Sequence, residues 1–278
     1  MRTGLIVLAV VVAAGAVVMA AGTGTWRRGT ARKVEALAAA AVAPAAADLS
    51  GLPAPVARYF ARALATDQPM VRSAVAIQDA EFFLNGAWRP LTATQHFIAA
   101  QPGFVWDASI RMAPLMPAWV RDAYVGGHGS MQASLYGLYS FVDQSGTPEL
   151  NAGALQRYLA EAVWLPTALL PSPSLSWAPR DDHSAVATLV DGATGVSLLF
   201  EFDGEDDVVQ VSGERFQEAG GAYTLKPWVV SCGEHRERSG LRIPVRCEVA
   251  WLERGQPAPY WRGRISSITY HFGAARQP

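Results

Sequence analysis

The sequence has few cysteines and few charges, and both shortages exclude classes of protein. Its 278 residues include two cysteines, Cys232 and Cys247, which form no CxxC pair and have no zinc-finger spacing, so a structural zinc site is excluded. Charged residues make up only 17% and the net charge is −1. This excludes the basic field that nucleic-acid binding needs. With 50% hydrophobic residues, the chain is instead typical of a core-rich globular protein.

Motifs of the common catalytic classes are also missing. Residues 126–130 (GGHGS) contain no lysine and precede a strand pattern, so they indicate a hairpin turn rather than a phosphate-binding loop. Gln132 occupies the place of a glycine in a G-x-S-x-G elbow around Ser130, and no H-E-x-x-H occurs. We therefore expect no metal and no cofactor. Whether the protein is an enzyme stays open, and the missing motifs weigh against it.

The N-terminus carries one long uncharged segment. Leu5 to Ala21 is an unbroken run of apolar and small residues, and the first charged residue after it is Arg27, which follows Trp26. As a helix, residues 3–26 would extend about 36 Å, enough to cross a hydrocarbon layer of about 30 Å. We expect residues 1–26 to be a single-pass membrane anchor, with Trp26 at the membrane interface. The competing interpretation is a signal segment cleaved after Ala20, but no cysteine follows the run, which excludes lipid attachment there.

Two signals disagree about the side of the membrane on which the rest of the chain lies. Arg27, Arg28, Arg32 and Lys33 follow the anchor, and the positive-inside rule would keep them in the cytoplasm. A disulfide between the two cysteines would instead require an oxidising compartment. On the second ground we expect an extracytoplasmic domain, although the sequence leaves the conflict open.

The chain divides into three parts. After the anchor, residues 27–50 are rich in alanine and are typical of a stalk that becomes a linker, and residues 51–278 form one globular domain. A short amphipathic helix is expected near 52–64, and a second helix at 152–164, capped by Asn151 and ended by Pro166. Alternating patterns predict strands near 73–84, 87–99, 103–112, 118–126, 129–142, 184–191, 195–203, 206–215, 223–236, 242–253 and 259–272.

This pattern predicts an α+β, mainly β fold. Many consecutive antiparallel strands with about two packing helices hide their apolar face best as a strongly curved sheet or half-barrel. The concave face is expected to be apolar, with inward residues Phe104, Trp106, Ile110, Phe200, Phe202, Val249 and Trp251. Such a surface suits a lipid or another hydrophobic small molecule. Candidate ligand-binding residues are Phe104, Trp106, Ile110, Arg157, Glu161, Trp164, Phe200 and Trp251.

The two cysteines are expected to lie opposite each other on neighbouring strands. Ser239-Gly240 predicts a two-residue turn, so that paired residues have numbers that sum to 479 and Cys232 faces Cys247. A disulfide is one interpretation of this pair, and two reduced core thiols are the other.

Several sequence blocks resemble an uncharacterised bacterial family, domain of unknown function 6544. The blocks are Leu52-Pro53-Ala54-Pro55-Val56, residues 94–97 (TQHF), 102–108 (PGFVWDA), 121–125 (RDAYV) and 157–171 (RYLAEAVWLPTALLP), and the pattern Pro257-x-x-Tyr260-Trp261-Arg262-Gly263. The resemblance implies membrane association and no known activity. The expected architecture is similar to that of the lipoprotein-carrier fold.

Three hypotheses for function remain. The first is a membrane-anchored module that binds an apolar or lipid-like ligand in the curved sheet. The second is an enzyme of unknown class that uses a polar cluster near the helix 152–164, made of Asp107, Asp122, His96, Arg157 and Glu161. The third is a structural envelope protein with a filled core and no ligand.

Overall fold

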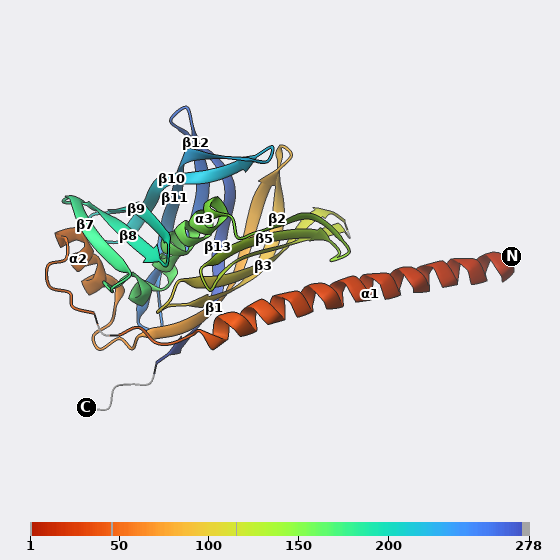
Figure 1. Cartoon of the computed structure of the whole chain (residues 1–278), viewed down its shortest axis with the longest axis horizontal. Helices are drawn as coiled ribbons and strands as arrows, with labels where there is room; N and C mark the ends of the chain where they lie inside the picture. Colours follow the sequence, from red (N-terminus) through yellow and green to blue (C-terminus); the bar gives the residue numbers. More distant parts are fainter. Residues whose placement is uncertain (1, 46, 115, 274–278) are drawn as a thin grey trace.

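The strands of the computed structural model belong to one open antiparallel sheet. The structure describes residues 2–45, 47–114 and 116–273, without the side chains of residues 2–12 and 14. Within these ranges thirteen strands follow the order β6-β5-β4-β3-β2-β1-β13-β12-β11-β10-β9-β8-β7 (Figure 1). Each half of the chain is a meander of neighbouring strands, and β1 pairs with β13 to join the two halves. The predicted mainly β architecture is therefore confirmed.

The first half of the sheet contains β1 (Val71–Leu84), β2 (Ala87–Ile98), β3 (Gly103–Ala113), β4 (Met116–Val125), β5 (His128–Leu135) and β6 (Tyr139–Ser145). The second half contains β7 (Leu175–Asp181), β8 (Ser184–Asp191), β9 (Thr194–Phe202), β10 (Val208–Ala219), β11 (Ala222–Arg238), β12 (Leu241–Glu253) and β13 (Gln256–Phe272). The helices are α1 (Arg2–Ala39), α2 (Ala54–Ala63) and α3 (Pro148–Glu161), followed by the short 3₁₀ turns Ala162–Trp164 and Pro166–Leu169.

Helix α3 lies inside the curve of the sheet. It connects the two halves and contacts β4 and β5 on one side and β9 and β10 on the other, so the sheet wraps around it (Figure 1). Its buried face carries Leu155, Tyr158 and Leu159, all part of the main core. The Tyr158 hydroxyl donates to the carbonyls of Ile98 and Ala99. The predicted strongly curved sheet with packing helices thus has α3 as the helix that lies within its hollow.

Three local predictions need correction. Residues 129–142 form two strands rather than one, because Tyr136 and Gly137 both take positive φ angles and reverse the chain. Strand β7 was not expected. Helix α3 begins at Pro148, and the side chain of Thr147, not Asn151, caps it by accepting from the Leu150 amide.

Helix α1 packs on the convex face of the sheet with its C-terminal half. Leu37 is buried in a small second core with Ile98, Val105 and Ala123. The Trp26 ring lies 6.1 Å from that of Trp119, so Trp26 contacts the sheet, and its position at a membrane interface stays a prediction. In the described part of the chain, no helix combines the length and apolarity needed to span a bilayer. Most of the apolar run predicted as the anchor, Leu5 to Ala21, belongs to residues that the structure describes without their side chains.

Candidate functional site

The concave face encloses a cavity of about 760 Å³ between both halves of the sheet and α3. Most of its lining is apolar or aromatic, as the period-2 alternation predicts for the inward face. Phe104 and Phe200 are fully buried in the core and are not part of the lining. The other six candidate ligand-binding residues line the cavity: Trp106, Ile110, Arg157, Glu161, Trp164 and Trp251.

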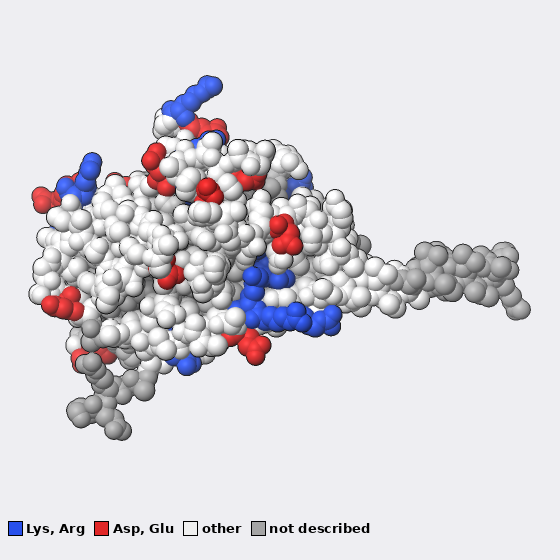
Figure 2. All heavy atoms as spheres, viewed as in Figure 1, with Lys and Arg blue, Asp and Glu red and all other residues white. Residues whose placement is uncertain are grey.

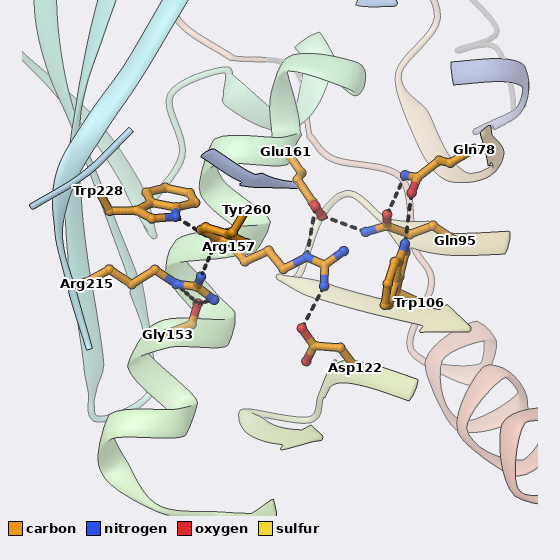
Figure 3. Close-up of polar contacts among 10 residues, drawn as sticks. All are labelled: Gln78, Gln95, Trp106, Asp122, Gly153, Arg157, Glu161, Arg215, Trp228 and Tyr260. Atoms are coloured by element: carbon orange, nitrogen blue, oxygen red, sulfur yellow. Dashed lines mark hydrogen bonds and ion pairs between the residues drawn. The ribbon is translucent and has the colours of Figure 1, made fainter. Parts of the chain in front are cut away.

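A buried ionic triad forms one wall of the cavity. The Nε of Arg157 donates to Glu161 Oε1 at 2.8 Å, and its Nη1 donates to Asp122 Oδ2 at 2.7 Å (Figure 3). All three side chains are only 16–17% exposed. The guanidinium also lies over the rings of Phe104 and Trp106, at 5.0 and 4.9 Å. Since Asp122 belongs to β4, the triad fastens α3 to the sheet as well as facing the cavity.

Burial and the neighbouring charges shift the pKa values of Glu161 and Arg157 in opposite directions. Burial raises the pKa of Glu161 above its ordinary value, although Arg157 and a hydrogen bond from Gln95 act against this rise. Burial alone would lower the pKa of Arg157, but Glu161 and Asp122 outweigh it and leave that pKa above its ordinary value. Arg157 is therefore a permanent cation, and the charge of Glu161 depends on its contacts.

Two buried glutamines extend the triad across the sheet, and sequence reasoning missed both. Gln95 Nε2 donates to Glu161 Oε2 at 2.6 Å, and Gln78 Nε2 donates to Gln95 Oε1 at 2.8 Å (Figure 3). The Trp106 indole donates to Gln78 Oε1 at 2.8 Å. Both glutamines are 0% exposed, so each amide satisfies a group that burial would otherwise leave unpaired. The sequence feature that could have indicated them is a glutamine at an inward position of a strand face that is otherwise apolar.

A second polar group lines the opposite side of the cavity. Arg215 on β10 donates to the carbonyl oxygen of Gly153 on α3 and, at 3.3 Å, to the hydroxyl of Tyr260 (Figure 3). The guanidinium lies 5.1 Å from the centre of the Trp228 ring. Lys226 is directly opposite Arg215 on β11. Among the described residues neither cation has a carboxylate within salt-bridge distance, so positive charge gathers here without a fixed counter-ion.

Two members of the predicted polar cluster lie on the other face of the sheet. Asp107 accepts from the Trp26 indole at 3.0 Å and from the Thr30 hydroxyl at 2.6 Å, which places it beneath α1. His96 is paired with Val105, a residue of the second core on the convex face, and burial lowers its pKa. The structure therefore separates Asp107 and His96 from the triad.

The predicted register of the cysteines is confirmed. Cys232 pairs with Cys247, and the β11–β12 pairs sum to 479 from Trp228–Trp251 to Arg238–Leu241. The turn residues Ser239 and Gly240 have φ angles of 52° and 78°, as a type I′ turn requires. The two sulfurs are 3.8 Å apart and belong to free cysteines, so the disulfide itself stays a prediction.

Comparison with solved structures returns distant likenesses. They include a DUF1329 family protein from Desulfovibrio piger, at 8% identity and a TM-score of 0.40, and a LolA superfamily protein from Nitrosomonas europaea, at 8% identity and a TM-score of 0.39. Each alignment covers 72% of this chain and 86% of the chain of the other protein. Likenesses at this level carry no argument about function.

Comparison of the sequence itself gives a family but no activity. No curated protein matches it. The family model that matches carries a different number from the expected 6544, so the broader expectation of an uncharacterised family is the part that is confirmed. The match spans residues 50–270, and the chain therefore belongs to the family of unknown function DUF6920.

Proposed function

We propose that the protein binds an apolar or lipid-like ligand in the concave cavity. The observation that carries this proposal is the cavity itself. Its volume of about 760 Å³ lies within the range of about 300–1,000 Å³ that ligand sites occupy, and its lining is mainly apolar with a few converging polar groups. A purely structural protein with a filled core would have no such space, so the cavity favours a ligand over the envelope role.

The polar groups of the cavity favour binding over catalysis. Arg157 holds both Asp122 and Glu161, so neither carboxylate of the triad is free to act as a general base without breaking an ion pair. Asp107 and His96, which the enzyme hypothesis also needs, lie on the convex face. A few polar groups in an apolar site orient a ligand, and the triad and Arg215 fit that role for a ligand with one polar end.

The proposal includes a tether to the membrane through the N-terminal segment. Its support is the uncharged sequence that precedes the contact of Gly22 with the domain, because residues 3–21 extend about 28 Å as a helix, close to the thickness of about 30 Å of a hydrocarbon layer. An extracytoplasmic domain is also part of the proposal, and it depends on oxidation of the two opposed cysteines.

Binding of N-phenyl-1-naphthylamine, an uncharged fluorescent probe, tests the cavity. Val249→Trp adds bulk to a half-buried residue that lines it, and we expect this change to abolish the binding. Val190→Trp is the matched control, because Val190 is 47% exposed on β8 and does not line the cavity. Equal probe affinity in the two variants, with both folded by circular dichroism, would refute the proposed site. Native mass spectrometry of the protein extracted from cells would then identify the natural ligand.

A further inference from the structure

Exposed hydrophobic side chains gather where α1 leaves the sheet. We name them the apolar collar, and they come from α1 and from the β5–β6 hairpin: Val17, Val18, Met19, Leu138, Tyr139 and Phe141. Their exposed fractions run from 45% for Met19 to 69% for Val17. Isolated exposed hydrophobic residues are ordinary, but a contiguous set at one end of a molecule marks an interaction surface.

Close packing between α1 and the hairpin makes the collar continuous. A Cβ atom added to Gly22 would lie 2.5 Å from the backbone oxygen of Tyr136 and 2.6 Å from Cγ of Leu138. Only glycine permits this approach, so the hairpin turn sits directly on the helix. Val18 and Met19 come four and three residues before Gly22 and share its helix face. The two groups of exposed side chains are therefore neighbours.

Basic residues follow the collar along α1. No charge occurs between residues 13 and 26, and then Arg27, Arg28 and Arg32 are all exposed. Figure 2 shows Lys and Arg side chains gathered along the helix where it reaches the body of the protein. An exposed apolar surface that includes the aromatic residues Tyr139 and Phe141, followed along the helix by basic groups, is the arrangement found at a bilayer surface with acidic head groups. Binding of a protein partner would not require apolar residues to be followed by basic residues along the axis of α1.

The collar also reaches the cavity. Phe141 is 51% exposed, belongs to the collar and lines the cavity, and its neighbour Val142 lines the cavity too. The exposed apolar surface is therefore continuous with the cavity wall at β6. An apolar molecule that passes from the collar into the cavity at this place meets the apolar side chains of Phe141 and Val142.

We infer that the apolar collar enters the surface of a phospholipid bilayer, so that the cavity opens next to the membrane and exchanges its ligand with it. The exchange rests on the proposed function, and the α1 residues of the collar belong to the proposed tether, whereas the contact of the hairpin with the bilayer rests on its own exposed residues. The hairpin is then a second membrane contact of the folded domain, separate from the N-terminal apolar run.

Photo-crosslinking of the full-length protein in cell membranes tests this inference. The photoreactive amino acid p-benzoylphenylalanine replaces Tyr139 in one variant and Val190, an exposed residue of β8 at the other end of the sheet, in the control. We expect mass spectrometry to find lipid adducts at position 139 and at least about tenfold fewer at 190. That ratio corresponds to about 1.4 kcal/mol of preference for the bilayer. Equal labelling, or adducts of position 139 with another protein or a second copy, would overturn the bilayer contact.

Probe binding by the same Tyr139 variant separates the two proposals. Naphthylamine binding without lipid adducts overturns the bilayer contact and leaves the cavity function standing. Lipid adducts without naphthylamine binding overturn the cavity function and support the contact of the collar with the bilayer.

Discussion

Replacing Arg157 by methionine would remove the only cation of the buried triad. Methionine keeps most of the length and the apolar stem of the side chain, so packing against Trp106 changes little. The carboxylates of Asp122 and Glu161 would then face each other without the cation that now bonds both of them. Their side chains are 16% and 17% exposed, so water can replace only part of the lost interaction.

The expected loss of stability follows from this burial. Removing one partner of a buried ion pair typically costs about 3–5 kcal/mol, because the remaining charge is left uncompensated. For a domain of this size each kcal/mol lowers the melting temperature by about 2–4 °C, so we expect Arg157→Met to lower it by about 6–20 °C at pH 7.

The loss should depend on pH. Glu161 already has a raised pKa in the folded protein, so the native state binds more protons than the unfolded state, and stability falls as pH rises from about 4.3, the ordinary value, to the folded pKa. Without Arg157 the pKa of Glu161 in the folded protein rises further. The pH range over which stability falls therefore extends to higher pH. The deficit of the variant relative to the wild type is therefore smaller at pH 4.5 than at pH 7.

Urea unfolding followed by tryptophan fluorescence at both pH values measures these differences. The triple variant Arg157→Met/Asp122→Asn/Glu161→Gln carries no buried charge at this place, and we expect it to regain at least half of the loss. Arg236→Met is the matched control, since Arg236 is exposed on β11, and it should cost less than about 0.5 kcal/mol. A loss below about 1 kcal/mol for Arg157→Met at pH 7, or the same deficit at both pH values, would refute the reasoning.

Three further outcomes are expected. Mild oxidation with copper phenanthroline should join Cys232 to Cys247, whose sulfurs are 3.8 Å apart, and two free thiols remaining by mass spectrometry would contradict the predicted disulfide. Thr147→Ala should lower the free energy of unfolding by about 1 kcal/mol, because it removes the N-cap of α3, and Thr147→Ser should restore it in the same urea titration. Asp107→Ala removes the acceptor of Trp26, so amide hydrogen exchange should quicken in residues 22–37 while naphthylamine affinity stays unchanged; loss of that affinity would contradict the separation of the two faces.

Patterns within one strand or one turn predicted the sheet well. Alternation in single strands placed Trp106 and Trp251 on the cavity side, and the Ser239-Gly240 turn alone set the register of β11 and β12. Both depend on residues that are close in sequence. The split of residues 129–142 was missed because the left-handed turn begins at Tyr136, a residue type that rarely adopts positive φ.

Contacts between distant segments could not be predicted in the same way. The Trp26 indole donates to Asp107, 81 positions away, and no residue near Trp26 in the sequence indicates that its indole docks on a sheet. The Gln78–Gln95 pair needs the register of β1 and β2 as well as the position of α3. Alternation alone sends Asp107 outward, because its neighbour Trp106 points inward, but the inward position of Asp122 follows only from the pairing of Trp106 with Asp122 between β3 and β4.

The uninterrupted α1 acts as a rigid rod whose rotation is coupled to the domain. Residues 22–37 are fixed to the sheet, and the helix continues to Arg2 without a break, so no hinge separates its first half from the cavity. One alanine inserted between Ala20 and Ala21 would turn everything before it by about 100° relative to the cavity opening. Seven inserted residues, almost two full turns, would nearly restore the original phase while lengthening the rod by about 10 Å. The number of residues in this segment thus sets the direction in which the cavity points.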